Sequence, residues 1–422
     1  MTRDRLAALT HLPALAIAAA AGIASAACDG SSRWGGVRDS AGIRIVESVE
    51  PLLDSTRAWR ISERPSVVIG DDSSVAAQQF ADIGGALVLG GGRIVVVNGR
   101  PPELRLFDST GRHIRTIGRR GEGPGEFARP REVIRYRGDS IAVHDRFGFK
   151  VSVFDSSGAF GRSALAPRTR STPALRHSSD IPTLIGAVAS GDLTFAFPDR
   201  FAEGNAEIIV GDLLLVRSTA DGQRSDTIAA VPGIENVVAP GSGPVRRKPY
   251  LFTGFARAAS TDSILLVTTP RQNTVTAYRL SGSPVLIARD LRPARPVDRD
   301  LMARYARFLR GSVRPDMDNP DPEVTIRRLV EETPTPDSIA GFTDIRIDAT
   351  GHVWVRHVGV PGVDTTDARY SIFDQRGALL TDVRVPAQFY IADVGAAYVL
   401  GVHHDSLGVQ SIRRYALQKP PD

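Results

Sequence analysis

The fold is decided by residues 85–117, which read GALVLGGGRIVVVNGRPPELRLFDSTGRHIRTI. Four short apolar runs lie in this stretch, at residues 85–89, 93–97, 103–107 and 113–117. Gly, Asn, Pro and Asp residues separate the runs, which is typical of strands joined by tight turns. The stretch therefore predicts an antiparallel meander of four strands.

Similar units recur along the chain. Residues 132–158 repeat the pattern, and the turn FDSTG of residues 107–111 returns as FDSSG at residues 154–158. Weaker copies begin near residues 192, 263, 352 and 398, which makes six cycles. Repeated four-stranded units are typical of a β-propeller, in which neighbouring blades bury each other's faces. We predict an all-β fold, a six-bladed β-propeller of four-stranded antiparallel blades over residues 42–419.

Two segments depart from the repeat. The sixth cycle lacks a fourth strand, whereas residues 42–47 form a spare strand ahead of the first blade, so we expect this N-terminal strand to pair with the last blade and close the ring. Residues 297–338 predict a short helical insertion between the fourth and fifth blades. Asp298 is its N-cap, Pro322 opens a second helix, and the apolar positions share one helical face. These apolar residues are Leu301, Met302, Tyr305, Phe308 and Leu309.

The N-terminus has the order of an export signal. Arg3 and Arg5 precede an apolar run over residues 12–23 and four small residues at 24–27, so residues 1–27 predict a signal peptide. The only cysteine, Cys28, follows directly. This arrangement resembles a bacterial lipoprotein signal, which implies that Cys28 carries a lipid; the alternative is ordinary cleavage that leaves a free thiol. Residues 28–41 predict a flexible tether.

The composition limits the partners. The chain has 422 residues, a net charge of +5 and only three lysines among its 52 basic residues, so the arginine excess reflects composition and not a nucleic-acid-binding surface. We expect an exported monomer, periplasmic or held at the cell envelope as a membrane-anchored lipoprotein. It would contact the membrane only through the lipid anchor.

The most distinctive motif is GRRGEGPGEF at residues 118–127. A phosphate-binding loop would lead into a helix, but another strand follows here, so we reject a nucleotide site. The motif instead predicts a crossover between two blades, in which glycines allow a tight path and Phe127 wedges between the blades. Its structural residues are Gly118, Gly121, Gly123, Pro124, Gly125, Glu126 and Phe127.

This motif and the ending YVLGV at 398–402 with DSLGV at 405–409 resemble the bacterial six-bladed β-propeller proteins related to NHL-repeat propellers. Many members of that family are exported or lipid-anchored. The resemblance covers residues 42–416 and implies the fold without implying one activity. Related propellers include scaffolds, sugar-lactone hydrolases and an antibiotic-ring lyase.

Candidate ligand-binding residues stand where the second strand of each unit ends, because these ends converge at the central channel of a propeller. They are Asn98, His144, Asp145, Asp199, Arg271, His357, His404 and Asp405. Some of their oxygen atoms could hold a calcium-like divalent metal, as in a lactonase. The alternative is that Asp145 and Asp199 cap the turns that follow them.

The pattern indicates binding more than catalysis. No Gly-x-Ser-x-Gly elbow stands between a strand and a helix, so no nucleophile or other catalytic residue is assigned. We expect no cofactor unless a divalent metal occupies the channel. The favoured interpretation is a binding or scaffold propeller that presents its loop and channel face to an unknown protein, small-molecule or glycan ligand. The alternative is a metal-dependent, lactonase-like hydrolase or a lyase.

Overall fold

A computed structural model describes residues 34–72, 74–168, 181–198, 208–238, 247–249, 251–314 and 321–420. The predicted signal peptide, Cys28 and Asp199 lie outside these ranges. Within them, no helix is long and apolar enough to cross a membrane.

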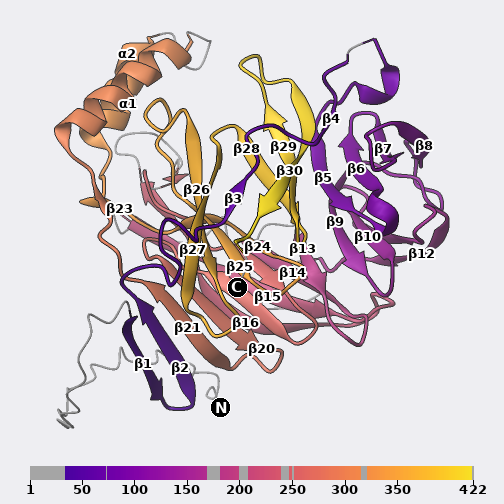
Figure 1. The fold of residues 1–422 in the computed structure, drawn as a ribbon, viewed down its shortest axis with the longest axis horizontal. Helices are drawn as coiled ribbons and strands as arrows, with labels where there is room; N and C mark the ends of the chain where they lie inside the picture. The colour runs from indigo at the N-terminus through magenta and orange to yellow at the C-terminus, as the bar shows by residue number, and fades with distance from the viewer. Residues whose placement is uncertain are drawn as a thin grey trace, which may run out of the picture. The chain divides into compact units, whose positions relative to one another are not determined.

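The structure contains six blades, each built around an antiparallel meander (Figure 1). Blade 1 holds β5 (Ile83–Val88), β6 (Ile94–Gly99), β7 (Pro102–Phe107) and β8 (His113–Ile117). Blade 2 holds β9 (Pro130–Tyr136), β10 (Ser140–Asp145), β11 (Lys150–Phe154) and β12 (Phe160–Leu165). Blade 3 holds β13 (Thr183–Ala187), β14 (Leu193–Pro198), β15 (Ile208–Ser218), β16 (Ser225–Val238) and β17 (Arg247–Pro249).

Blades 4 to 6 follow in chain order. Blade 4 holds β18 (Ala258–Ser260), β19 (Ile264–Thr268), β20 (Thr274–Arg279) and β21 (Pro284–Asp290). Blade 5 holds β24 (Phe342–Ile347), β25 (Val353–His357), β26 (Asp367–Phe373) and β27 (Leu379–Pro386). Blade 6 holds β28 (Phe389–Val394), β29 (Tyr398–His404) and β30 (Gln410–Gln418). The predicted six-bladed β-propeller is confirmed.

Both faces of a blade are apolar, which is why the blades must pack together. All six residues of β6 are buried. Successive side chains of a strand point to opposite faces. Ile94 and Val96 therefore pack with blade 6, whereas Val95 and Val97 pack with blade 2. Burial of apolar surface on both sides of every sheet holds the ring together.

An N-terminal strand does close the ring, but residues 42–47 were the wrong segment. β3 (Arg60–Ile61) and β4 (Val67–Ile69) pair antiparallel with β30 and supply the outer edge of blade 6. β2 (Ile43–Ser48) instead lies parallel to β21 on the outer edge of blade 4. β3 and β4 therefore replace the missing fourth strand of blade 6, whereas β2 adds a fifth strand to blade 4.

The predicted tether is also shorter than residues 28–41. Residues Trp34–Ser40 form a strand, β1, which pairs antiparallel with β2. A hairpin of two strands therefore extends blade 4 where a linker was expected, and residues 28–33 lie outside the described part of the chain.

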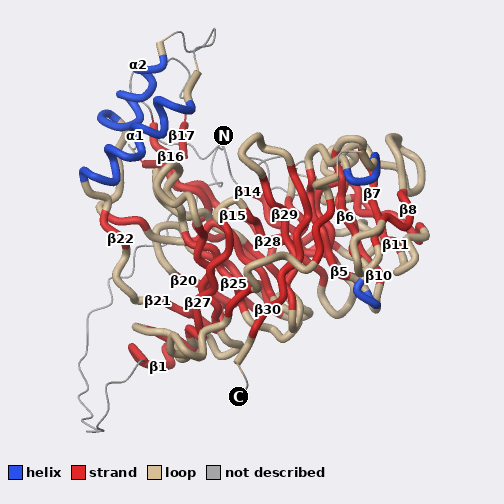
Figure 2. The backbone as a smooth tube through the Cα atoms, turned by 45° about the horizontal axis from the view of Figure 1, so that its top comes forward, coloured by secondary structure: helices blue, strands red, loops and turns tan. Residues whose placement is uncertain are grey.

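The helical insertion lies between blades 4 and 5, as predicted, and stands apart from the sheets (Figure 2). It contains α1 (Arg299–Ser312) and α2 (Pro322–Arg327), followed by a π-helical turn (Arg328–Glu332). The Asp298 carboxylate accepts a hydrogen bond from the Leu301 amide at 2.8 Å, which confirms the N-cap. Phe308, expected on the buried face, is 37% exposed. The short strands β22 (Arg295–Pro296) and β23 (Ser338–Ile339) pair at the base of the insertion.

The crossover motif joins blades 1 and 2 as predicted. Phe127 is fully buried between these blades and contacts the ring of Phe154, with centroids 5.9 Å apart. Gly118 has a φ of +76°, and an added Cβ would lie 2.6 Å from the Phe127 ring, so only glycine fits there. The Glu126 carboxylate accepts hydrogen bonds from Arg119 Nε at 2.8 Å and from the Gly123 amide at 3.0 Å. These bonds within the loop stabilise its conformation.

A candidate ligand pocket on blade 5

Most of the candidate residues in the described part of the chain form contacts within their own blades. Asn98 is fully buried on blade 1, where its side chain bonds to the backbone at Ala81, Arg100 and Pro101. Arg271 lies 3.6 Å from Glu235 of blade 3. His404 contacts Gln410 across its own hairpin, at 3.0 Å. These contacts organise the loops and do not converge on one point.

The two aspartates in the described part of the set act as turn caps. The buried Asp145 carboxylate accepts hydrogen bonds from the backbone amides of Ala128, Arg129 and Gly148. Asp405 accepts from the amides of Leu407 and Val409, each at 2.8 Å. For Asp145 the turn-capping alternative is confirmed. Within the ranges that the structure describes, no group of three or more His, Cys, Asp or Glu residues could hold a metal ion.

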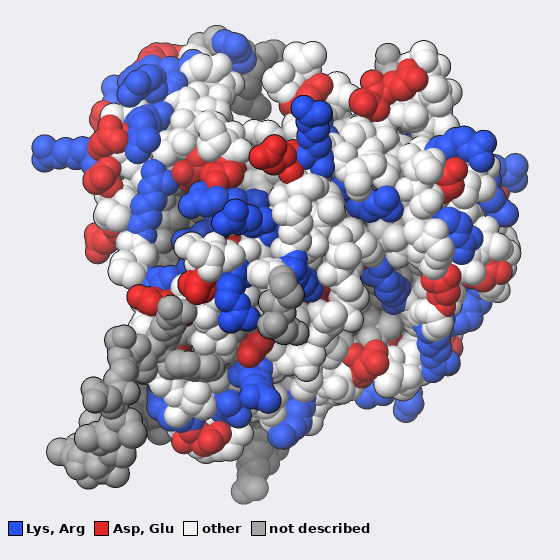
Figure 3. Space-filling model, viewed as in Figure 1, with Lys and Arg blue, Asp and Glu red and all other residues white. Residues whose placement is uncertain are grey.

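His357 lines a pocket of substantial size. The cavity has a volume of about 400 Å³ and lies over the ends of β25, β26 and β27, with a wall formed by residues 292–295. Residue 273, which precedes β20 of blade 4, and the segment at 339–341 complete its lining. Figure 3 shows basic side chains gathered around a hollow beside blade 5. A cavity of this size suits a small organic ligand.

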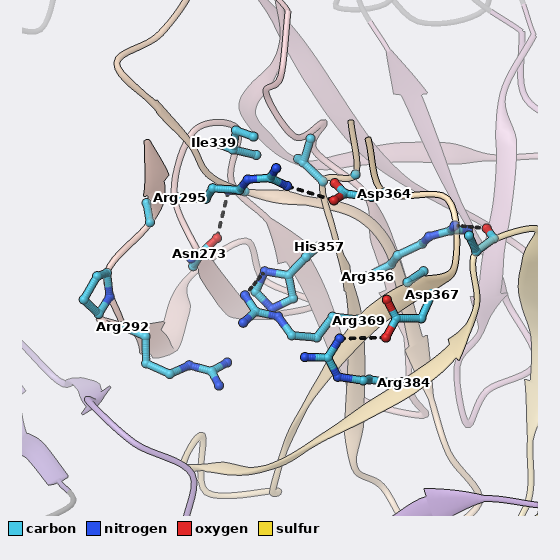
Figure 4. A pocket seen from close by; sticks show the side chains of 17 residues that line it. Asn273, Arg292, Arg295, Ile339, Arg356, His357, Asp364, Asp367, Arg369 and Arg384 are labelled. Carbon is cyan, nitrogen blue, oxygen red and sulfur yellow. Dashed lines mark hydrogen bonds and ion pairs between the residues drawn. The ribbon is translucent and has the colours of Figure 1, made fainter. Parts of the chain in front are cut away.

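Five arginines line the pocket, and three of them form ion pairs; those of Arg295 and Arg384 are drawn in Figure 4. Arg295 pairs with Asp364 at 2.8 Å, and Arg384 pairs with Asp367 at 2.6 Å. Arg292 binds two carboxylates, those of Asp290 at 2.8 Å and Asp382 at 2.5 Å. The remaining two are Arg356 and Arg369.

Neither Arg356 nor Arg369 forms an ion pair with a carboxylate of the described residues, although Arg356 lies opposite Asp344 in the register of β24 and β25. Arg356 donates to the carbonyl of Ala387 at 2.9 Å and lies over the ring of Tyr390, 4.1 Å from its centroid. Its Nη1 atom is buried without a hydrogen-bond partner in the described chain. Arg369 donates through Nη2 to His357 Nδ1 at 3.0 Å.

A hydrogen-bond chain runs beneath these guanidinium groups. His357 Nδ1 accepts from Arg369, so the neutral ring carries its proton on Nε2 and donates to Ser371 Oγ at 2.7 Å. Ser371 in turn donates to the Asp382 carboxylate at 2.7 Å. Burial, together with the nearby Arg369 guanidinium, lowers the pKa of His357 to about 3. The imidazole is therefore neutral at physiological pH.

Ser371, His357 and Asp382 do not form a catalytic triad. In a triad the aspartate orients the histidine, and the histidine takes the proton of the serine. Here Asp382 bonds to the serine, and an arginine occupies the other side of the histidine. Ser371 is also fully buried, so its oxygen could not reach a substrate. The chain positions Arg292 and Arg369 instead of activating a nucleophile.

Most of these residues were missed in the sequence because they become neighbours only through strand pairing. Ser371 lies opposite Asp382, and Arg369 lies opposite Arg384, in the register of β26 and β27. Two arginines that face each other across a hairpin form an unfavourable pair. Counting residues outward from the turn at 374–377 could have revealed this pair as a signal for an anionic partner.

The comparisons with known proteins agree with the fold. Residues 80–167 match the family DUF5128, described as 6-bladed beta-propeller. The chain is a six-bladed β-propeller protein. This match covers the crossover motif and blades 1 and 2, where the sequence repeat is clearest. No curated protein matches the chain.

Several solved structures have a similar course of the chain. A Bacteroides fragilis protein described as exported is 11% identical, with 89% of this chain and 100% of that chain covered and a TM-score of 0.48. A DUF4221 family member from Bacteroides vulgatus is 8% identical, with 86% and 98% covered and a TM-score of 0.46. A calcium-binding protein, regucalcin, from Agrobacterium tumefaciens is 12% identical, with 85% and 95% covered and a TM-score of 0.41. Likeness at this level carries no information about ligand or activity.

Proposed function

We propose that this propeller is a ligand-binding protein of the cell envelope that takes a small molecule or a glycan unit into the blade 5 pocket. The observation that carries the proposal is the pocket itself, a cavity of about 400 Å³ at the loop ends of three strands. Its lining side chains are fixed by ion pairs and hydrogen bonds before any ligand arrives. Such preorganisation favours binding because few side chains remain to be ordered.

The chemistry of the described residues favours binding over catalysis. A metal-dependent hydrolase or lyase would need a metal set or an accessible acid–base pair. The described residues offer no cluster of three metal-ligating side chains, and the Ser371 network is buried and wrongly connected for nucleophilic attack.

The envelope location rests on the N-terminal sequence. Residues 1–27 have the order of an export signal, and Cys28 follows its small residues. Metabolic labelling with a fatty-acid analogue tests the anchor. We expect label on the wild-type protein and none on Cys28→Ser; an unlabelled wild type would remove the anchor from the proposal.

A blocked pocket tests the binding role. Gly359 is exposed at the pocket, and the nearest atoms to an added Cβ there are 3.9 Å away, so Gly359→Trp can place an indole over the opening without a clash at Cβ. The wild-type protein and this variant are screened by thermal shift against envelope sugars, sugar acids and sugar phosphates. We expect compounds that stabilise the wild type and not the variant.

The control is Leu165→Trp on blade 2, where the leucine is 61% exposed. It adds a tryptophan far from the pocket lining and should keep the wild-type response. If every stabilising compound acts equally on Gly359→Trp, the pocket is not the binding site and the proposal fails.

A further inference from the structure

We propose that the ligand of this pocket carries a carboxylate or phosphate group, held by Arg369. The inference rests on the proposed function and adds the chemical class of the ligand. It follows from the charges in the pocket, from the rigidity of the Arg369 guanidinium group and from the size of the cavity.

The first observation is a pair of like charges. Arg369 of β26 and Arg384 of β27 are direct partners in the strand register. Like charges that face each other across two strands destabilise the sheet. Asp367 neutralises Arg384 at 2.6 Å, but no carboxylate of the described chain forms an ion pair with Arg369. The repulsion at Arg369 is therefore only partly relieved by the protein.

The second observation is how the carboxylates around the pocket are distributed. Those of Asp290, Asp364, Asp367 and Asp382 form ion pairs with Arg292, Arg295 and Arg384. Arg356 lies opposite Asp344 in the register of β24 and β25, whereas Arg369 lies opposite another arginine. The Arg369 guanidinium lies beside His357 at the pocket (Figure 4). A single anionic group on a ligand would pair with it.

The third observation is that the Arg369 guanidinium group is held in place. Arg369 is fixed by its hydrogen bond to His357, which stays neutral and so adds no charge of its own. Burial lowers the pKa of Arg369, and the nearby Arg292 guanidinium adds to this effect, whereas the Asp382 carboxylate opposes it, as a bound anion would. A fixed guanidinium group binds carboxylate and phosphate oxygens with charge-assisted hydrogen bonds.

The volume limits the rest of the ligand. About 400 Å³ lies near the lower end of the range for small-molecule pockets, so the anionic group belongs to a molecule about as large as one or two sugar units. A neutral sugar would leave the Arg369 charge without an ion pair. The pocket should therefore bind a sugar acid more tightly than the neutral sugar that has the same ring.

Isothermal titration of the signal-free chain with matched probes tests this inference. Glucuronate and glucose differ chiefly in one carboxylate, and glucose 6-phosphate tests the phosphate form. We expect saturable binding of at least one anionic probe and none of glucose at the same concentration. The affinity should fall as sodium chloride is raised, because the contact is electrostatic.

Substitutions locate the contact. Arg369→Gln keeps hydrogen-bonding capacity and removes one charge, and we expect it to weaken binding by about 10-fold or more, as loss of a charged hydrogen bond does. Arg279→Gln is the matched control, because Arg279 is exposed at the far end of β20 from the pocket and loses the same charge. It should bind as the wild type does.

The outcomes separate the two proposals. If glucose binds as tightly as glucuronate, or Arg369→Gln binds an anionic probe normally, the anionic class is wrong while ligand binding stands. If none of the anionic probes binds, the anionic class is overturned, whatever the pocket-blocking screen finds. If Gly359→Trp leaves all binding unchanged, the pocket itself is wrong.

Discussion

Two buried histidines, one on blade 2 and one on blade 5, occupy similar positions in their blades but have different bonding partners. His144 lies near the end of β10 and His357 ends β25, the second strand of each blade. His144 Nδ1 contacts the Glu132 carboxylate at 2.7 Å, and its ring packs edge-on against Phe195 of blade 3. His357 has Ser371 on one side and the Arg369 guanidinium on the other.

The difference lies in the charge of the partner. Glu132 also accepts from Arg146 at 2.8 Å, so blade 2 forms a closed cluster in which the carboxylate is matched. Burial alone would raise the pKa of Glu132, but its bonds to His144 and Arg146 lower it. On blade 5 the histidine accepts from the Arg369 guanidinium, which forms no ion pair with a carboxylate of the described chain. A matched cluster contributes to stability, and an unmatched one can bind a ligand.

The largest effect should come from breaking the blade 2 cluster. Glu132→Ala removes the carboxylate between His144 and Arg146 and leaves both side chains without their partner. Its side chain is only 15% exposed, so we expect the free energy of unfolding to fall by about 3 kcal/mol. Chemical denaturation measures this loss. Glu122→Ala, at an exposed glutamate, should change little, and a loss below about 1 kcal/mol in Glu132→Ala would contradict the stabilising role.

A smaller effect is expected at the serine beneath the pocket. Ser371→Ala removes the oxygen that bonds to Arg292, His357 and Asp382, and should lower the free energy of unfolding by about 1–3 kcal/mol. It should also weaken glucuronate binding, because His357 and Arg369 lose their support, whereas Glu132→Ala should leave that affinity unchanged.

Ser152 on blade 2 provides the control for this prediction. It is fully buried on the third strand of its blade, as Ser371 is, but its hydroxyl has no hydrogen-bond partner in the described chain. Ser152→Ala should therefore be nearly neutral in stability and in binding. Equal losses in the two alanine variants would show that the Ser371 network has no special role.

The last prediction concerns pH. The pKa of His357 is about 3 in the folded protein and near 6.5 when the ring is free in water. Between these values the unfolded chain binds a proton that the folded chain does not, so stability falls as the pH is lowered from 6.5 toward 3. His357→Gln removes this contribution.

Melting temperatures from pH 7 to pH 4 provide the measurement. The wild type should lose more stability over this range than His357→Gln, while His113→Gln on blade 1 should follow the wild type. Parallel curves for the wild type and His357→Gln would show that the pocket histidine is not held neutral.

Local patterns predicted the fold well because each of its signals lies within a few residues. The meander of blade 1, the Asp298 N-cap and the Phe127 crossover all depend on neighbours along the chain, and all are confirmed. The closing strand was misplaced because residues 42–47 pair with the complete blade 4, whereas β3 and β4 fill the edge of blade 6. Pairing between distant edges depends on which edge the folded ring brings near.

The pocket shows the limit of the same reasoning. The position of His357 could be inferred from its strand, but its partners are separated from it in the sequence. Arg292 comes from the segment after blade 4, and Ser371 and Asp382 meet only in the register of β26 and β27. Spacing along the chain therefore identified the strand end and not the charge that surrounds it.

The sequence by itself determined the repeat, the number of blades, the crossover and the place of the insertion, because periodic apolar residues and turn residues act locally. The tertiary structure alone decided how the ring is closed and which arginines lack a carboxylate. The reason is physical: burial patterns can be read one strand at a time, whereas an unbalanced charge depends on every group that packing brings within a few ångströms.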